Sequence, residues 1–170
     1  HPQLKEFENI CPVIVPVGID QDPHIRLTRD ISKRVKNPKF TQLSSTYNLF
    51  ISGLKGGKMS ASDPTSYIAS TDSPKEVKKK INKYAFSGGQ PTLEEHRKKG
   101  GNPDIDVSYQ YLKILEQDDN KLKEIYNNYK SGKLLTGELK ALTIDTINNF
   151  LKQHQAKMKD AKKDIDKYLA

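Results

Sequence analysis

The sequence predicts a small α/β unit followed by a larger all-α region, so that the chain is predominantly helical. Three observations predict this fold class: one short β-branched run near the start, capping signals that follow Asp72, and apolar residues at helical spacing after it. Because so few strands cannot make a doubly wound sheet, the first part is expected to be the end of a larger domain. Two domains are expected, at residues 1–72 and 73–170.

The α/β unit is expected to begin with a strand at Val13–Ile19, because this run is short, apolar and β-branched, as in a buried parallel strand with Pro16 near its end. Asp22 is expected to cap a helix that has Pro23 at its first position. A second short strand is expected at Tyr47–Ile51. The apolar face of the predicted helix consists of Ile25, Leu27, Ile31 and Val35.

The all-α region shows several helix signals. Ser73 and Glu76 form a predicted capping box, and Thr92 and Glu95 form a second one. Two further helices are expected on either side of Asp118-Asp119, a pair that is expected to be a helix cap rather than a catalytic pair of carboxylates. The second of these helices should stop at Gly132, and a last one should run from Thr136 almost to Leu169. Predicted core positions are Val77, Ile81, Tyr84, Ala85, Val107, Tyr111, Leu112, Leu115, Leu122, Ile125, Tyr126 and Tyr129.

The composition favours a polyanionic partner. The formal net charge is +8 and the sequence pI is about 9.4, and each cation that neutralises a phosphate releases condensed counterions. Nucleic acid is the leading partner of this kind, although a lysine-rich surface that mainly keeps the protein soluble is the alternative. Since lysines far outnumber arginines, the charge supplies point attraction rather than bidentate base reading. The lysine-rich segment 157–167 alternates with Asp and is expected to be a solvated helix face.

The cysteine and histidine positions and the short apolar runs argue against a disulfide-bonded protein, a metal site and a membrane helix. Cys11 is the single cysteine and is expected to be a buried small hydrophobe, without an internal disulfide. His24, His96 and His154 have no metal-ligand spacing with it, so no metal site is expected. No apolar stretch approaches the roughly 20 residues of a membrane helix, and the polar start is not a signal peptide. A soluble, cytoplasmic protein is therefore expected.

Segment 56–64, with the sequence GGKMSASDP, holds two glycines, one lysine and two serines. Such a loop suits an anion that must be grasped and released, and an ordinary surface turn is the alternative. A phosphate-binding P-loop does not match, because Ser52 stands where the pattern needs glycine and Met59 follows the lysine. A Walker-type nucleotidase is therefore not expected.

Two signatures occur in the order of a known family. Residues 58–62, KMSAS, resemble the KMSKS signature of class I aminoacyl-tRNA synthetases, with Ala61 in place of its second lysine. Residues 15–21 resemble the Gly-x-Asp-Gln turn of the tyrosyl and tryptophanyl enzymes. Segments 85–89, 94–97, 100–102, 106–108 and 135–140 resemble the helical domain of archaeal and eukaryotic-type tryptophanyl enzymes. The resemblance implies an α/β remnant of a nucleotide-binding, Rossmann-like catalytic domain, followed by an all-α helical anticodon-binding domain.

The resemblance implies a two-step reaction, in which tryptophan and ATP form an adenylate that is then transferred to tRNA. It gives Lys58 the role of holding the departing pyrophosphate, with hydrogen bonds from Ser60 and Ser62 and with ATP bound as its Mg²⁺ complex. Electrostatic positioning of this kind is the main task of a protein that stabilises moving phosphate charge. Met59 would place its backbone near adenine, and the alternative is a packing residue at a hinge.

The resemblance also assigns roles to the residues of the Gly-x-Asp-Gln turn. Gly18, which lacks a Cβ atom, would let the ribose of ATP approach, and the Asp20 carboxylate would accept hydrogen bonds from its hydroxyls. Gln21 would bind the amino group of tryptophan. The structural alternatives are a strand-end glycine, a helix-capping Asp20 and a solvated Gln21.

The implied partners are tRNA(Trp), ATP and L-tryptophan, with a homodimer for the full-length enzyme. Gln90 would hydrogen-bond an anticodon base, although Gln90-Pro91 replaces an Arg-Asp pair that is frequent in the family. Tyr109 and Tyr111 could stack RNA bases, and the core is the better interpretation for Tyr111. The His-Ile-Gly-His-type signature is absent from the sequence, so the chain alone is expected to be inactive. A non-catalytic RNA-binding helical module and a tyrosyl-type relative remain as alternatives.

Overall fold

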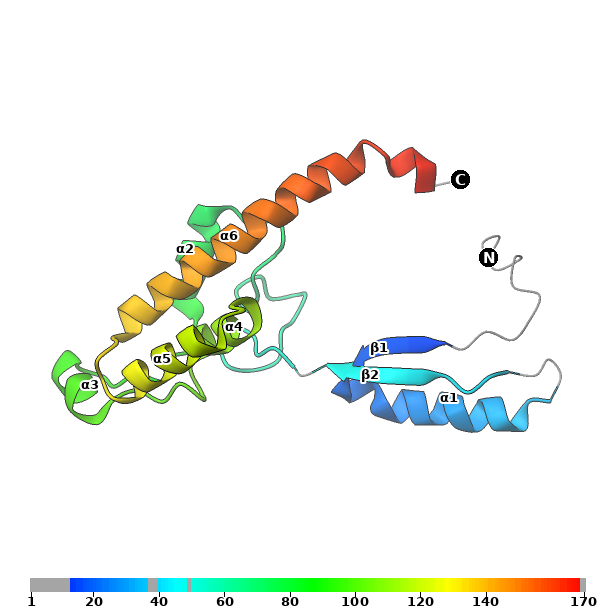
Figure 1. Cartoon of the computed structure of the whole chain (residues 1–170), viewed down its shortest axis with the longest axis horizontal. Helices are drawn as coiled ribbons and strands as arrows, with labels where there is room; N and C mark the ends of the chain where they lie inside the picture. The colour runs from blue at the N-terminus through cyan, green and yellow to red at the C-terminus, as the bar shows by residue number, and fades with distance from the viewer. Residues whose placement is uncertain (1–12, 37–39, 49, 169–170) are drawn as a thin grey trace. The chain divides into compact units, whose positions relative to one another are not determined.

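The computed structural model describes residues 13–36, 40–48 and 50–168, so the prediction for Cys11 lies outside the described residues. The chain divides into two compact units between Phe50 and Ile51. Each unit is described here by itself (Figure 1).

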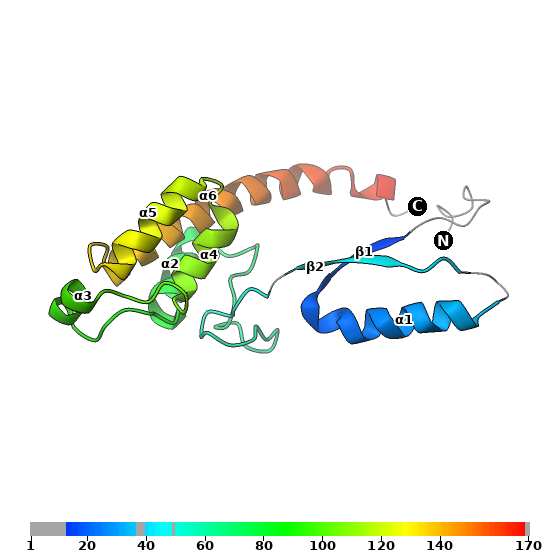
Figure 2. The ribbon, with the colours of Figure 1, turned by 60° about the horizontal axis from the view of Figure 1, so that its bottom comes forward.

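The first unit is a β-α-β element. Strand β1 (Ile14–Gly18) leads through a 3-10 turn, η2 (Ile19–Gln21), into helix α1 (Asp22–Arg34), and strand β2 (Ser44–Asn48) follows. The strands pair in parallel, with Ile14 opposite Ser44 and Gly18 opposite Asn48. Figure 2 shows α1 running beside the strand pair. The Arg29 guanidinium ties the helix to the second strand by donating to the Leu43 carbonyl oxygen and the Ser45 hydroxyl, at 3.0 and 2.9 Å.

Burial in this unit differs from the prediction. The parallel pairing is confirmed, but β1 is not buried, since Val13 is 50% and Ile14 68% exposed. On the predicted apolar face of α1, Ile25 is buried, whereas Leu27 and Ile31 are more than half exposed. The physical reason is that a parallel strand becomes buried only when helices cover both faces of its sheet, and the described part of this unit has one α-helix.

Three local predictions in this unit were wrong. Pro16 lies in the middle of β1 rather than near its end, and β2 begins three residues before the predicted start at Tyr47. The structure pairs Pro16 with Thr46 in a two-stranded sheet, where both strands are edge strands and a missing donor is tolerated. Asp22 is the first residue of α1 rather than its cap, because its carboxylate accepts the Tyr47 hydroxyl at 2.6 Å and pairs with Arg26 at 2.6 Å.

The second unit is helical. Its elements are α2 (Pro74–Tyr84), α3 (Leu93–Lys99), α4 (Val107–Leu115), α5 (Asp119–Lys130), α6 (Thr136–Lys162) and a 3-10 turn, η3 (Ile165–Tyr168). Helices α2 and α4 both pack along α6 (Figure 1). The completely buried apolar side chains of its core are Leu54, Val77, Ile81, Val107, Tyr129 and Leu139.

The capping predictions were largely correct. Ser73 and Glu76 form the full capping box, and Asp118 caps α5 by accepting the backbone N–H groups of Asn120 and Lys121. Thr92 caps α3, but its hydroxyl donates to the Glu95 carboxylate, so the reciprocal backbone bond is not formed there. Helix α6 ends at Lys162 rather than near Leu169.

Residues 51–72, which the sequence assigned to the first domain, belong to the helical unit. Leu54 is completely buried in the same cluster as Val77 and Ile81, although the sequence suggested that residues before Asp72 belong with the α/β unit. The division at Asp72 into a catalytic and a helical domain stays a prediction about function. The compact units themselves separate after Phe50.

Candidate active site

The Gly18–Gln21 turn lies directly after β1, at the carboxyl end of a parallel strand. This is the place where open α/β sheets bind ligands. A Cβ atom on Gly18 would lie 2.8 Å from Asp20 Oδ1, so glycine lets the carboxylate fold back over the turn. Asp20 and Gln21 are both exposed. The turn therefore presents one carboxylate and one amide to solvent, side by side.

The base of the KMSAS loop is held by a buried serine. Ser66 is 4% exposed, and its hydroxyl accepts the Ser60 N–H at 3.0 Å and faces the Asp63 carbonyl oxygen at 2.7 Å. The Ser66 carbonyl oxygen accepts the N–H of Leu54, whose own carbonyl oxygen accepts the Phe86 N–H at 2.7 Å. The loop is thus hydrogen-bonded to the segment that follows α2.

The tip of the loop carries the predicted phosphate-binding groups. Lys58 is exposed and forms no ion pair with any residue that the structure describes. Ser60 and Ser62 are also exposed, and their hydroxyl oxygens lie 2.9 Å apart. Met59 is partly buried and packs against the helical core, as the packing alternative expected. The loop therefore brings one ammonium and two hydroxyls to its surface.

An ion pair braces the loop next to its tip. Lys55 Nζ lies 2.8 Å from Asp63 Oδ2, and the N–H and hydroxyl of Thr65 donate to Asp63 Oδ1. The hydrogen bond from Lys55, followed by those from Thr65, lowers the pKa of Asp63 to about 2. Asp63 consequently stays ionised at any physiological pH, and its ion pair engages Lys55 rather than Lys58.

Gln90 lines a separate cleft of about 410 Å³ in the helical unit, with Pro91, Leu93 and residues at the start of α6. Its Nε2 donates to the Gly100 carbonyl oxygen at 3.0 Å, which fixes the amide orientation. The side-chain oxygen, as an acceptor, and the second N–H of Nε2, as a donor, are therefore left for a ligand. Pro91 is exposed at the rim.

A buried network supports the Gln90 segment. The completely buried Asp106 carboxylate accepts the Gly88 N–H and the Tyr129 hydroxyl, both at 2.8 Å. Burial is the main cause that raises the pKa of Tyr129 to about 12, so this hydroxyl stays a donor. A Cβ atom on Gly101 would lie 2.5 Å from the Tyr129 ring, so glycine at this position permits close packing against the ring.

His96 links this network to the cleft beside Gln90. Its Nδ1 accepts the Gln90 N–H at 3.4 Å and its Nε2 faces the Leu134 carbonyl oxygen at 2.9 Å, which together define the neutral tautomer with a proton on Nε2. The histidine is 3% exposed and packs on the Tyr129 ring. It is a structural residue rather than a metal ligand.

The sequence interpretation missed the residues that hold the loop. Ser66, Asp63 and Lys55 were not assigned roles. The Asp-Pro-Thr-Ser run after KMSAS is a turn signal, but it does not show which side chains meet when the loop folds. Tyr111 is 9% exposed and its core assignment is confirmed. Among the described residues, no group of three or more His, Cys, Asp or Glu side chains could hold a metal, and no helix is long and apolar enough to cross a membrane.

The Gly18–Gln21 turn at the carboxyl end of a parallel strand and the KMSAS loop are together typical of a class I tRNA synthetase. The family model for tRNA synthetases of class I (W and Y) matches residues 3–152, and the chain belongs to this family. It is 54% identical over 151 residues to a tryptophan–tRNA ligase of Sulfurisphaera tokodaii, covering 88% of this chain and 39% of that protein. It is 48% identical over 171 residues to the cytoplasmic tryptophan–tRNA ligase of Saccharomyces cerevisiae, covering 99% and 39%.

Solved structures agree with this placement. The crystal structure of tryptophanyl-tRNA synthetase from Aeropyrum pernix K1 is 41% identical, with a TM-score of 0.86, and the match covers 96% of this chain and 45% of that one. A tyrosyl-tRNA synthetase from Archaeoglobus fulgidus is 24% identical, with a TM-score of 0.64 over 84% and 46% of the chains, and shows the shared fold alone. The chain thus spans between 39% and 46% of the length of these relatives.

Proposed function

We propose that this chain supplies the end of the nucleotide-binding catalytic domain and the helical anticodon-binding domain of a cytoplasmic tryptophan–tRNA ligase. The observation that carries the proposal is the exposed Lys58, which forms no ion pair with the described residues, on a loop whose base is locked by Ser66. The identity to tryptophan–tRNA ligases supports the choice of amino acid. The full-length enzyme would act as a homodimer.

The loop would stabilise the charge that moves during adenylate formation. Tryptophan attacks the α-phosphate of the Mg²⁺ complex of ATP and pyrophosphate leaves, so negative charge grows on the leaving group. Lys58 would hold this charge while Ser60 and Ser62 donate hydrogen bonds to it, and the Met59 backbone would lie near adenine. Removing one preorganised group of this type lowers kcat by roughly 10²–10³-fold.

The Gly18–Gln21 turn would bind the ribose of ATP and the amino group of tryptophan. Gly18 would admit the ribose, Asp20 would accept hydrogen bonds from its hydroxyls, and Gln21 would accept one from the tryptophan amino group. In the helical unit Gln90 would use its free oxygen to accept from the exocyclic amine of an anticodon base. The fixed Gln90 amide supports this use as an acceptor.

The experiment is a chimera in which this chain replaces the matching 39% of the Saccharomyces cerevisiae enzyme. The chimera should catalyse tryptophan-dependent exchange between pyrophosphate and ATP, and the 170-residue chain alone should not. Lys58→Ala in the chimera should slow exchange by about a hundredfold or more while tRNA binding changes little. Lys78→Ala, which removes an exposed lysine from α2, is the matched control.

Three results would contradict the proposal. An equal loss of exchange and tRNA binding in the Lys58→Ala chimera would remove the assigned role of Lys58. A wild-type chimera that binds tRNA but never exchanges would favour the non-catalytic RNA-binding module, which the net charge of +8 also suits. Exchange that depends on tyrosine would favour the tyrosyl-type relative.

A further inference from the structure

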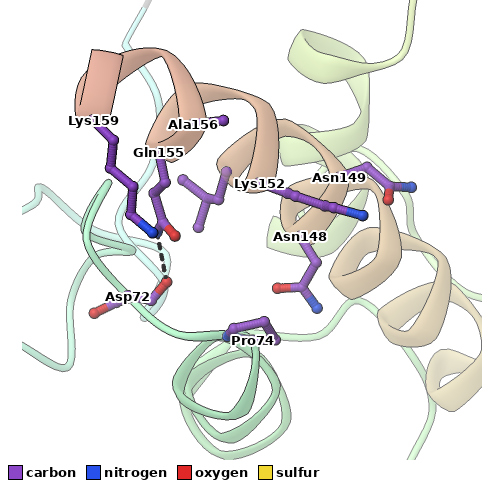
Figure 3. A pocket seen from close by; sticks show the side chains of 9 residues that line it. Asp72, Pro74, Asn148, Asn149, Lys152, Gln155, Ala156 and Lys159 are labelled. Atoms are coloured by element: carbon purple, nitrogen blue, oxygen red, sulfur yellow. Dashed lines mark hydrogen bonds between the residues drawn. The ribbon is translucent and has the colours of Figure 1, made fainter. Parts of the chain in front are cut away.

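The second half of α6 and the segment that leads into α2 enclose a cleft that the proposed function does not use (Figure 3). Its volume is about 430 Å³, and its polar lining includes Lys152, Gln155 and Lys159 on α6, with Asp72 facing them. Thr136, beside the Gln90 cleft, lies sixteen positions before Lys152 on the same helix. At 1.5 Å per residue the two clefts are therefore about 24 Å apart along α6.

The cleft is positively charged. Lys152 and Lys159 are exposed and form no ion pair with the residues that the structure describes. Asp72 is the one carboxylate of the lining, and it is already neutralised, because Lys80 Nζ lies 2.6 Å from its Oδ2 and the Ala69 N–H donates to the same oxygen. Two uncompensated ammonium groups therefore face the cleft.

The spacing of the two lysines favours a ligand with more than one anionic group. Lys152 and Lys159 are seven residues apart, so they share one helix face at a separation of about 10.5 Å. Figure 3 shows Lys159 at the Asp72 end of the cleft and Lys152 reaching toward Asn149. A single phosphate would engage one of them, whereas successive phosphates of a nucleic-acid backbone could engage both.

Between the lysines the cleft offers a hydrogen-bond acceptor. Gln155 Nε2 donates to the carbonyl oxygens of Ser70 and Asp72, at 2.9 and 3.1 Å, so both amide protons are used and the orientation of the amide is fixed. Its Oε1 accepts from no donor among the described residues. A ribose 2′-hydroxyl can donate to such an oxygen, and deoxyribose cannot.

We propose that this cleft binds the phosphate–ribose backbone of RNA, as a contact additional to the cleft beside Gln90. The proposal rests on the proposed function, since tRNA is the RNA that the ligase would hold. Lys152 and Lys159 neutralise phosphates of the backbone, and Gln155 accepts from a ribose hydroxyl between them. The second contact would fix the direction in which the RNA crosses the helical unit, because one contact alone leaves the RNA free to pivot.

The test compares two double variants of the 170-residue chain. Lys152→Ala with Lys159→Ala removes the cleft lysines, and Lys123→Ala with Lys130→Ala removes two exposed lysines that are also seven apart, on α5. Binding to a tRNA(Trp) transcript is measured by fluorescence anisotropy at several KCl concentrations. The cleft variant should bind about tenfold more weakly, with a salt slope reduced by about 1.4–1.8 for two lost phosphate contacts. Equal losses in the two variants, or none in the cleft variant, would overturn the proposal.

Two further arms separate the ligand classes. Inorganic phosphate at constant ionic strength should not displace the RNA from the wild-type chain, and displacement would instead indicate a site for a small anion. A DNA of the same sequence should bind more weakly than the RNA, and this difference should shrink in Gln155→Met, which keeps the side-chain length but has no acceptor oxygen. A DNA that binds as tightly as the RNA would remove the ribose contact from the proposal.

Failure of this inference can be told from failure of the proposed function. The cleft variant placed in the chimera should keep tryptophan-dependent exchange at the wild-type level, because no cleft residue is assigned to the adenylate. If the wild-type chimera exchanges and the cleft variant binds RNA normally, only the inference fails. If the wild-type chimera does not exchange, the proposed function fails by itself.

Discussion

The two units of this chain hold their proposed substrate-binding groups in different ways. In the described part of the first unit, Ile25 is the single buried apolar side chain, and the strands beside the Gly18–Gln21 turn are largely exposed. In the second unit two clusters of buried residues lie under the KMSAS loop and the Gln90 segment. The turn therefore rests on a thin support, whereas the loop rests on a core.

This difference suggests how the work of the proposed site is divided. The loop is anchored at Leu54 and Ser66, inside the helical unit, while its Lys58 tip stays exposed. A sheet of two parallel strands with one helix needs further layers to be buried, and the relatives are more than twice as long as this chain. We expect the helical unit to be stable by itself and the α/β unit to depend on additional chain.

The largest expected effect comes from the buried carboxylate of the helical unit. Asp106→Ala leaves the Gly88 N–H and the Tyr129 hydroxyl without their acceptor and removes the cap of α4. These losses should lower the free energy of unfolding of the helical unit by about 4 kcal/mol. Urea denaturation followed by circular dichroism measures the loss. Asp104→Ala, two residues earlier and exposed, is the control and should cost less than about 1 kcal/mol.

A matched pair of isoleucines tests the comparison directly. Ile81→Ala empties a completely buried position in the helical core and should cost about 3 kcal/mol, whereas Ile14→Ala changes a side chain in β1 that is 68% exposed and should cost less than about 1 kcal/mol. Both are measured by the same urea denaturation. If Ile14→Ala lowered the free energy of unfolding as much as Ile81→Ala, the α/β unit would have a core of its own. The proposed difference between the two units would then be wrong.

The same contrast explains what the sequence could and could not predict. The Ser73 capping box and the Asp118 cap were predictable because a cap depends on residues two or three positions apart. The exposure of β1 was not, because burial depends on what covers the sheet rather than on the strand itself. Ser66 was missed for a related reason: its role comes from a loop that folds back six residues to Ser60, and no local pattern marks that closure.

For the candidate site, the KMSAS motif identified the proposed phosphate-binding residues but not the residues that hold the loop in place. KMSAS pointed to Lys58, Ser60 and Ser62, which the structure places together on one loop. The brace between Lys55 and Asp63 depends on two side chains eight positions apart that meet only when the loop folds. Their pairing lies outside any helical or strand periodicity, so a sequence pattern could not reveal it.

The smallest expected effects concern two carboxylates, one in each unit. The pKa of Asp63 is lowered to about 2, first by the hydrogen bond from Lys55, and the pKa of Asp22 is lowered, first by that from Tyr47. A lowered pKa in the folded state means that the contact stabilises the fold above the ordinary pKa, near 3.8, and that this contribution is lost as the pH falls. For Asp63 the loss should extend from about pH 3.8 down to about pH 2.

An NMR titration of the aspartate carboxyl carbons measures both groups in one sample. Lys55→Ala should move the Asp63 midpoint upward, toward its ordinary value, and leave Asp22 unchanged, because the two carboxylates have separate donors. Tyr47→Phe should move the Asp22 midpoint upward and leave the Asp63 midpoint unchanged, since it removes only the hydroxyl that donates to Asp22. If Lys55→Ala left the Asp63 midpoint near 2, the brace would not exist in solution, and the stiffness of the loop would have to come from Ser66 alone.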